Sequence, residues 1–177
     1  MTTTMTVAGA LVAALVGLGA GFAVDEPTTA KERQFLLHAS QGQRAEIALG
    51  QIATERAAND KVKEFGRQMI DDHAKANEEL KQLASQEGVA LPKDVELPTA
   101  QRERAQRFQQ LSGNDFDRAY IGYMLREHTK DVREFEQSAS EIQDRDVKDW
   151  ASKTLPILKG HLKTARNIAE DLGIDMR

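Results

Sequence analysis

Residues 59–88 read NDKVKEFGRQMIDDHAKANEELKQLASQEG, and small or apolar side chains recur along them at alternating spacings of three and four. This spacing places them on one side of an α-helix, as in the inward-facing seam of a helix that packs into a bundle. Asn59 and Asp60 are typical of a helix start, and Gly88 is typical of a helix end. The seam consists of Val62, Gly66, Met69, His73, Ala76, Leu80 and Leu83. The pattern therefore predicts a long helix with a histidine on its inner side.

Three other segments have the same spacing and predict three more long helices. One covers 31–57, one opens at Asn114 or Asp115 and runs to about 142, and one covers 147–172. Pro156 lies inside the last of these, where the lost backbone hydrogen bond predicts a kink or a restart at Thr154. Between the second and third long helices lie a stretch with two prolines and a short amphipathic piece at 99–111. We expect an all-α, antiparallel four-helix bundle whose long connection contains a short helix.

The composition agrees with one helical domain and excludes several classes of function. Of 177 residues, 29% are charged and 5% aromatic, with few Gly or Pro, which favours helices. There is no cysteine, so disulfides, thiol catalysis and Cys-ligated zinc are excluded. The net charge is -4 without a block of basic residues, so we expect no nucleic-acid partner.

The N-terminal segment predicts export. Residues 6–24 carry no charge, and the small residues Gly21 and Ala23 fit cleavage by a signal peptidase after Ala23. We expect 1–23 to be a signal peptide, 24–30 a linker and 31–177 the bundle, in the periplasm or cell envelope. A retained membrane anchor is the alternative, because the apolar run is nearly long enough to span a bilayer. The first five residues lack the positive charge that usually begins an export signal.

Four inward polar residues are expected at similar heights in the bundle. Glu46 and His73 lie 13 and 14 residues from Asn59 at the first predicted turn, or about 20 Å along each helix. His128 and His161 lie 16 and 17 residues from the second turn, or about 25 Å. Both heights are near the middle of helices about 40 Å long. The four side chains are therefore predicted to converge.

A carboxylate and three imidazoles in a bundle core suit a single Zn, Fe, Mn or Cu ion. Met69 and Met124 each lie one turn before a seam histidine, and as accessory thioether ligands they would favour Cu(I). Methionine also fills apolar cores without binding anything. The alternative to a metal site is that each histidine is buried and hydrogen-bonded to Glu46, a neighbouring helix or water. We expect His38 at the surface.

Several ordered segments resemble one bacterial family. They are FLLHAS (35–40), EIALG (46–50), VKEFG (62–66), MIDDH (69–73), LP (91–92), FDRAY (116–120), MLREH (124–128) and His161. Together they resemble Domain of Unknown Function 4142 over residues 31–172, nearly all of the predicted bundle. The resemblance implies a ferritin-like fold and an exported or outer-membrane protein, without an established reaction. Matched by position, it points again to Glu46, His73, His128 and His161.

The chain departs from a ferritin-like di-iron site, which needs Glu three residues before its histidines. Ile70, Leu125 and Leu158 stand there instead, so iron storage and di-iron oxidation are not expected. Asp72 and Glu127, next to histidines in sequence, point about 100° away and are interpreted as surface groups or as supports for ligands.

No nucleophile motif or glycine-rich phosphate loop is present, so hydrolase or nucleotide chemistry is not supported either.

Three hypotheses about the function follow from these observations. The first is a non-enzymatic envelope protein, acting in stress tolerance or binding a partner. The second is a bundle that binds Cu, Zn or Fe, and the third, weaker one is a metal-dependent oxidoreductase.

Overall fold

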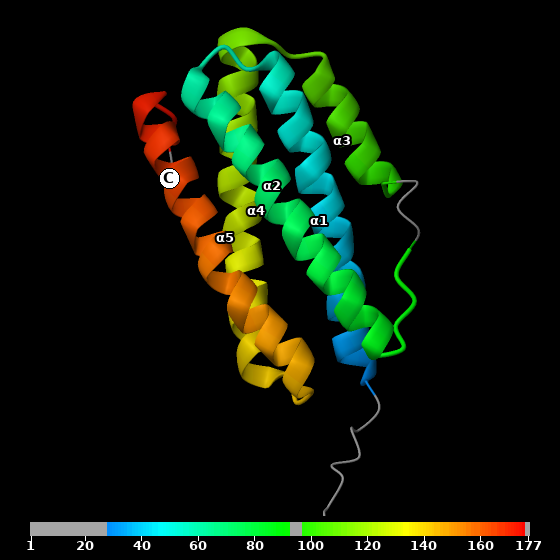
Figure 1. The fold of residues 1–177 in the computed structure, drawn as a ribbon. Coiled ribbons are helices and arrows are strands. Elements are labelled where there is room, and N and C mark those ends of the chain that lie inside the picture. The colour runs from blue at the N-terminus through cyan, green and yellow to red at the C-terminus, as the bar shows by residue number, and fades with distance from the viewer. Residues whose placement is uncertain (1–27, 93–96, 176–177) are drawn as a thin grey trace, which may run out of the picture.

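The computed structural model describes residues 28–92 and 97–175, and this part of the chain contains five helices and no strand. The helices are α1 (Ala30–Arg56), α2 (Asp60–Gln86), α3 (Thr99–Gln109), α4 (Gly113–Glu141) and α5 (Arg145–Asp171). The four long ones lie side by side in a helical bundle, and the short α3 packs against α1 (Figure 1). The predicted all-helical class is confirmed.

The long helices form two antiparallel hairpins that pack against each other. One hairpin is α1 and α2, the other is α4 and α5, and contacts between the hairpins join α2 to α5 and α1 to α4. The α3 helix runs back along α1, so the chain leaves α2 at one end of the bundle and begins α4 at the other (Figure 1). The long connection therefore crosses the length of the bundle, which makes α2 and α4 diagonal and parallel.

The helix ends follow from local capping groups. The Asn59 side chain accepts a hydrogen bond from the Lys61 amide at 2.8 Å, as expected for an N-cap. Gly88 has a φ of 63°, a left-handed conformation that glycine adopts without steric cost and that ends a helix. The α4 helix begins at Gly113, one residue before the earlier of the two predicted starts.

Of the two predicted effects of Pro156, the restart at Thr154 is wrong, because α5 is a single helix with Pro156 inside it, and the kink stays a prediction. Proline removes the hydrogen bond to the carbonyl four residues earlier, that of Ser152. Both Pro156 and Ser152 are exposed, so the carbonyl without a helical partner lies on the solvent side. The helix can therefore tolerate proline, because this carbonyl is free to accept a hydrogen bond from solvent instead.

Each hairpin turn is hydrogen-bonded to one buried carboxylate on a helix of the other hairpin. Asp117 on α4 accepts hydrogen bonds from the amides of Ala58 and Asn59 at 3.1 and 2.9 Å, in the α1–α2 turn. At the other end, Glu32 on α1 accepts from two amides of the α4–α5 turn, at 3.2 and 3.0 Å. Hydrogen bonds to a carboxylate are the stronger kind, so these contacts fix the lengthwise register of the hairpins.

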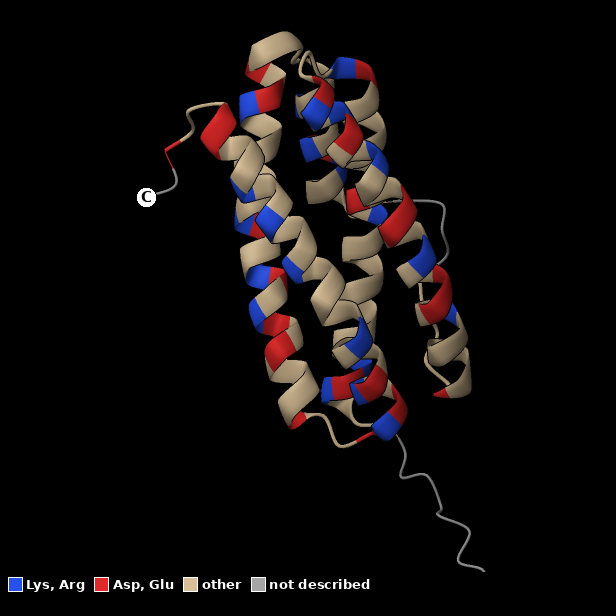
Figure 2. Ribbon diagram, turned by 60° about the vertical axis from the view of Figure 1, so that its left-hand side comes forward, with Lys and Arg blue, Asp and Glu red and all other residues tan. Residues whose placement is uncertain are grey.

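The apolar core has two parts with a polar layer between them. One part, near the α1–α2 turn, includes Phe65 and Tyr120, and the other, near the α4–α5 turn, includes Phe135 and Trp150. The three buried seam histidines belong to neither part and lie near the middle of α2, α4 and α5. Charged residues of both signs are distributed along the helices (Figure 2).

Within the described residues, no helix has the length and apolar character needed to cross a membrane. The predicted leader at 1–23 lies outside the described residues, as does most of the predicted linker at 24–30.

Candidate metal centre

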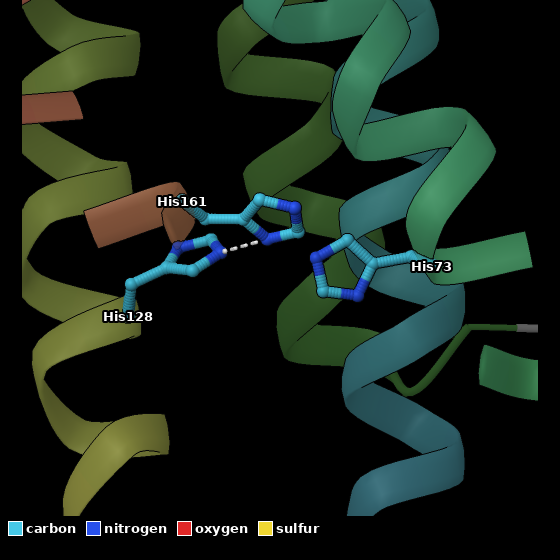
Figure 3. A group of neighbouring side chains, drawn as sticks. All are labelled: His73, His128 and His161. Atoms are coloured by element: carbon cyan, nitrogen blue, oxygen red, sulfur yellow. Dashed lines mark hydrogen bonds between the residues drawn. The ribbon is translucent and has the colours of Figure 1, made fainter. Parts of the chain in front are cut away.

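Three histidines from three helices meet in the polar layer. His73 comes from α2, His128 from α4 and His161 from α5, and each is less than 5% exposed. One ring nitrogen from each lies within 4.8 Å of the corresponding nitrogens of the other two (Figure 3). The predicted convergence of the three imidazoles is therefore observed.

In two of these rings, the outer nitrogen, which faces away from the other histidines, donates a hydrogen bond to an oxygen atom. His128 Nδ1 lies 3.1 Å from the Met124 carbonyl oxygen, one turn earlier on α4. His161 Nε2 lies 2.8 Å from Asp72 Oδ2, across the α2–α5 contact. A carbonyl and a carboxylate oxygen only accept, so each of these ring nitrogens carries the hydrogen and donates it. The inner nitrogens, His128 Nε2 and His161 Nδ1, then carry lone pairs.

These two inner nitrogens face each other at 3.3 Å, lone pair towards lone pair. Two neutral imidazoles in these tautomers have no hydrogen to share, so the contact needs either a second proton on one ring or a cation between them. The third ring also has a buried nitrogen without a hydrogen-bond partner. His73 Nδ1 donates to Gln43 Oε1 at 2.6 Å, which leaves His73 Nε2 buried with no hydrogen-bond partner in the described chain.

Burial opposes a second proton on any of the three rings. It lowers the pKa of His73 well below the ordinary value, and positive charge on either of the other two rings would lower it further. Burial and the His161 ring together lower the pKa of His128 to about 3, against the opposing effect of the Met124 carbonyl. For His161 burial again lowers the pKa and outweighs Asp72. All three rings are therefore neutral near pH 7, the form that binds metals.

The spacing of the inner nitrogens suits a metal ion. With bonds of about 2.1 Å in tetrahedral geometry, two ligand nitrogens lie about 3.4 Å apart. The His128 and His161 nitrogens, at 3.3 Å, already have this separation. His73, within 4.8 Å of both, needs a shift of roughly 1 Å to complete the set.

Glu46 does not join this group, although it was expected beside the histidines. It is buried on α1, and its Oε2 has no hydrogen-bond partner among the described residues. It lines a cavity of about 210 Å³ between α1, α3 and α4 that extends to His73. Burial, together with the charges of Asp131 and Glu127, raises its pKa well above the usual value. Asp131 lines the same cavity, and burial raises its pKa to about 7.

Two methionines and one further histidine were also singled out in the sequence. Met69 and Met124 are fully buried in the apolar cluster near the α1–α2 turn, so their role as accessory ligands stays a prediction. Met124 nevertheless serves the centre through its backbone carbonyl. His38 is at the surface as expected, with a side chain 65% exposed and bonded to Glu134 at 2.8 Å.

Two supporting residues were missed or assigned only in general terms. Gln43 precedes Glu46 by one helical turn, so it shares the inner side of α1, but nothing in its spacing indicates a histidine partner. Asp72 was expected to support a ligand or lie at the surface because it adjoins His73. It is half-buried and instead holds His161 on another helix, a contact that requires knowledge of which helices are neighbours.

The fold and site define a class of protein: an all-helical bundle with a buried three-histidine centre. The particular family follows from a family model, described as a domain of unknown function (DUF4142), which matches residues 19–168. The chain belongs to this family, as the resemblance had implied. Comparison with curated proteins and with solved structures gives no match.

Proposed function

We propose that this protein binds a single transition-metal ion through His73 Nε2, His128 Nε2 and His161 Nδ1. The observation that carries the proposal is the convergence of three buried ring nitrogens whose opposite nitrogens each donate to a protein oxygen. Such outer hydrogen bonds fix the tautomer and orientation of metal-binding histidines and raise their basicity. A purely structural histidine layer would be expected to pair its polar atoms with one another.

The ligand set indicates which ions the site would accept. Three neutral imidazoles without a thiolate suit Zn, Cu(II), Ni or Co, while a hard cation such as Mg prefers oxygen ligands. A buried divalent charge also needs anions nearby. Asp72 is bonded directly to one of the rings, and Glu46 lines a cavity that reaches another. The Asp72 carboxylate makes a divalent ion more favourable here than in an apolar core, whereas Glu46, whose pKa is raised by burial, contributes a negative charge only when a bound cation displaces its proton.

Three protein ligands leave one position of a tetrahedral ion for another group. The cavity that contains Glu46 adjoins His73, so it offers room for water or a small ligand on that side. We propose sequestration or delivery of the metal as the role. We do not propose di-iron chemistry, because the Glu residues of a di-iron site are absent. Leu158, which stands in one of their positions, is buried in the apolar core.

Metal stoichiometry tests this proposal. The full-length chain, purified without a histidine tag and stripped with chelator, is dialysed against Zn²⁺ and analysed for metal per chain. The chain and a His38→Ala control should each retain one equivalent, whereas His73→Ala and His161→Ala should retain far less. Equal retention by all four proteins would refute the three-histidine site.

We also propose that the bundle is ferritin-like in its antiparallel four-helix arrangement and that it acts in the cell envelope. The apolar residues 6–24 and the family resemblance support the location. If the leader is cleaved as proposed, the protein isolated from the periplasm will begin at Val24. A cytoplasmic protein that retains Met1 would contradict the export proposal and leave the metal proposal unaffected.

A further inference from the structure

A second cavity lies away from the histidines. It has a volume of about 680 Å³ and is formed by α3, α4 and the residues that follow α5. Four arginines line it: Arg104, Arg107, Arg118 and Arg126. The sequence contains no basic block, and only the packing of α3 beside α4 gathers these guanidinium groups.

In the described part of the chain, none of the four arginines makes a hydrogen bond or ion pair with a carboxylate, although Arg104 is close enough to Glu46 to lower the pKa of that carboxyl. Arg104 donates to the Tyr123 hydroxyl at 2.5 Å and lies 4.7 Å from the centre of that ring. Arg126 donates to the Gly122 carbonyl at 2.8 Å, within its own helix. Both are held in place by neutral groups, so their charges are not neutralised by these contacts.

The other two arginines are similar. Arg118 donates to the carbonyls of Leu172 and Gly173, which attach the end of α5 to α4. Arg107 is exposed, and no hydrogen bond or ion pair from its side chain is found among the described residues. Asp115 is the one carboxylate among the lining residues of the cavity. The lining therefore carries an excess of positive charge, in a protein whose net charge is -4.

The cavity also has an apolar wall. Phe108 is 7% exposed and belongs to the core. Leu111, Ala119 and Ile174 are partly buried and pack against the same core while lining the cavity. A lining that combines charged side chains with apolar ones is suited to a small amphipathic molecule.

We propose that this cavity binds a small amphipathic anion, one carboxylate or phosphate group on an apolar body. Guanidinium groups form paired, charge-assisted hydrogen bonds with both headgroups, and here none of them is hydrogen-bonded to a carboxylate. The apolar body lies against Phe108, Leu111 and Ile174 and is removed from water. This site goes beyond the metal centre and does not depend on it.

Calorimetric titration of the full-length chain tests the site with decanoate, decyl phosphate, decanol and inorganic phosphate. Both amphipathic anions should bind with one site per chain. Decanol, which lacks the charge, and phosphate, which lacks the apolar chain, should each bind at least about ten-fold more weakly. Decanol that binds as tightly as decanoate would overturn the role of the arginines. Phosphate that binds as tightly as decyl phosphate would overturn the role of the apolar wall.

Matched variants locate the site. Arg107→Gln and Arg126→Gln should each weaken decanoate binding about ten-fold, since each removes a charged hydrogen-bond donor. Arg133→Gln removes an exposed arginine from α4 outside the cavity and should change nothing. An equal loss in Arg133→Gln would mean that only net charge matters and would refute the proposal. His161→Ala should retain decanoate binding, and thermal unfolding of each variant confirms that it is folded.

Discussion

Replacing His128 with Asn should change how the stability of the metal-free protein depends on pH. Unfolded imidazole titrates near 6.5, whereas burial and the neighbouring His161 lower the pKa of folded His128 to about 3. Between these values the unfolded state binds more protons, so the free energy of unfolding falls as the pH falls below 6.5. Asn is chosen because its amide can still donate to the Met124 carbonyl.

The magnitude follows from the same two pKa values. At pH 5, 1.5 units below the unfolded value, the loss attributable to His128 is about 2 kcal/mol. Urea unfolding at pH 7.5 and pH 5, with chelator present, gives the stability of each protein. Relative to His128→Asn, the wild type should lose this amount on acidification. Other titrating groups of the interior, including His73, Glu46 and Asp131, are common to both proteins and largely cancel in the difference.

A stability difference that is the same at both pH values would refute the reasoning, because folded His128 would then titrate like an exposed imidazole. His38→Asn provides a control of opposite sign. The hydrogen bond that His38 donates to the Glu134 carboxylate raises the pKa of His38 in the folded state, although partial burial lowers it. Stability from a raised pKa is present below the unfolded value and is lost as the pH rises. Relative to His38→Asn, the wild type should therefore gain stability on acidification.

Four further substitutions test the packing of the helices and the support of the centre. Asp117→Ala removes the acceptor of two amides in the α1–α2 turn and should lower the urea-derived free energy of unfolding by about 3 kcal/mol. A change below about 1 kcal/mol would show that the turn does not need this carboxylate. Gly50→Ala places a Cβ 2.7 Å from the Gly66 carbonyl oxygen and should lower the free energy of unfolding by about 1–3 kcal/mol. Gly160→Ala, which has open space around its Cβ, should raise it by about 0.5–1 kcal/mol, and equal effects of the two variants would refute the close approach of α1 and α2. Asp72→Asn should weaken Zn²⁺ binding about 10–100-fold in a competition titration, and unchanged affinity would show that the contact with His161 is incidental.

The sequence predicts the helices well because each seam repeats at the helical period and is closed by a capping residue or glycine. It also places His73, His128 and His161 at one height, because the rise per residue is fixed in a helix and each height is counted from a short turn. Glu46 lines a cavity that also reaches His73, yet it does not join the three ring nitrogens. Height does not determine which helices are neighbours, and α1 packs on α2 and α4 while His161 lies on the diagonal helix α5.

The supporting residues show the same limit of sequence patterns. Gln43 and Asp72 act on histidines of other helices, so their partners depend on helix order and rotation. The arginine cavity depends on where the long connection places α3. Pro156 was overestimated as a helix breaker because its exposure, which allows water to replace the lost hydrogen bond, was not known.

An anomalous difference map from a crystal of the Zn²⁺-loaded protein tests the metal centre most directly. We expect one strong peak about 2.1 Å from His73 Nε2, His128 Nε2 and His161 Nδ1, with the outer hydrogen bonds of the three rings retained. A crystal in which the ion lies only at a surface pair such as His38 and Glu134, and in which the three buried rings bind nothing, would contradict it.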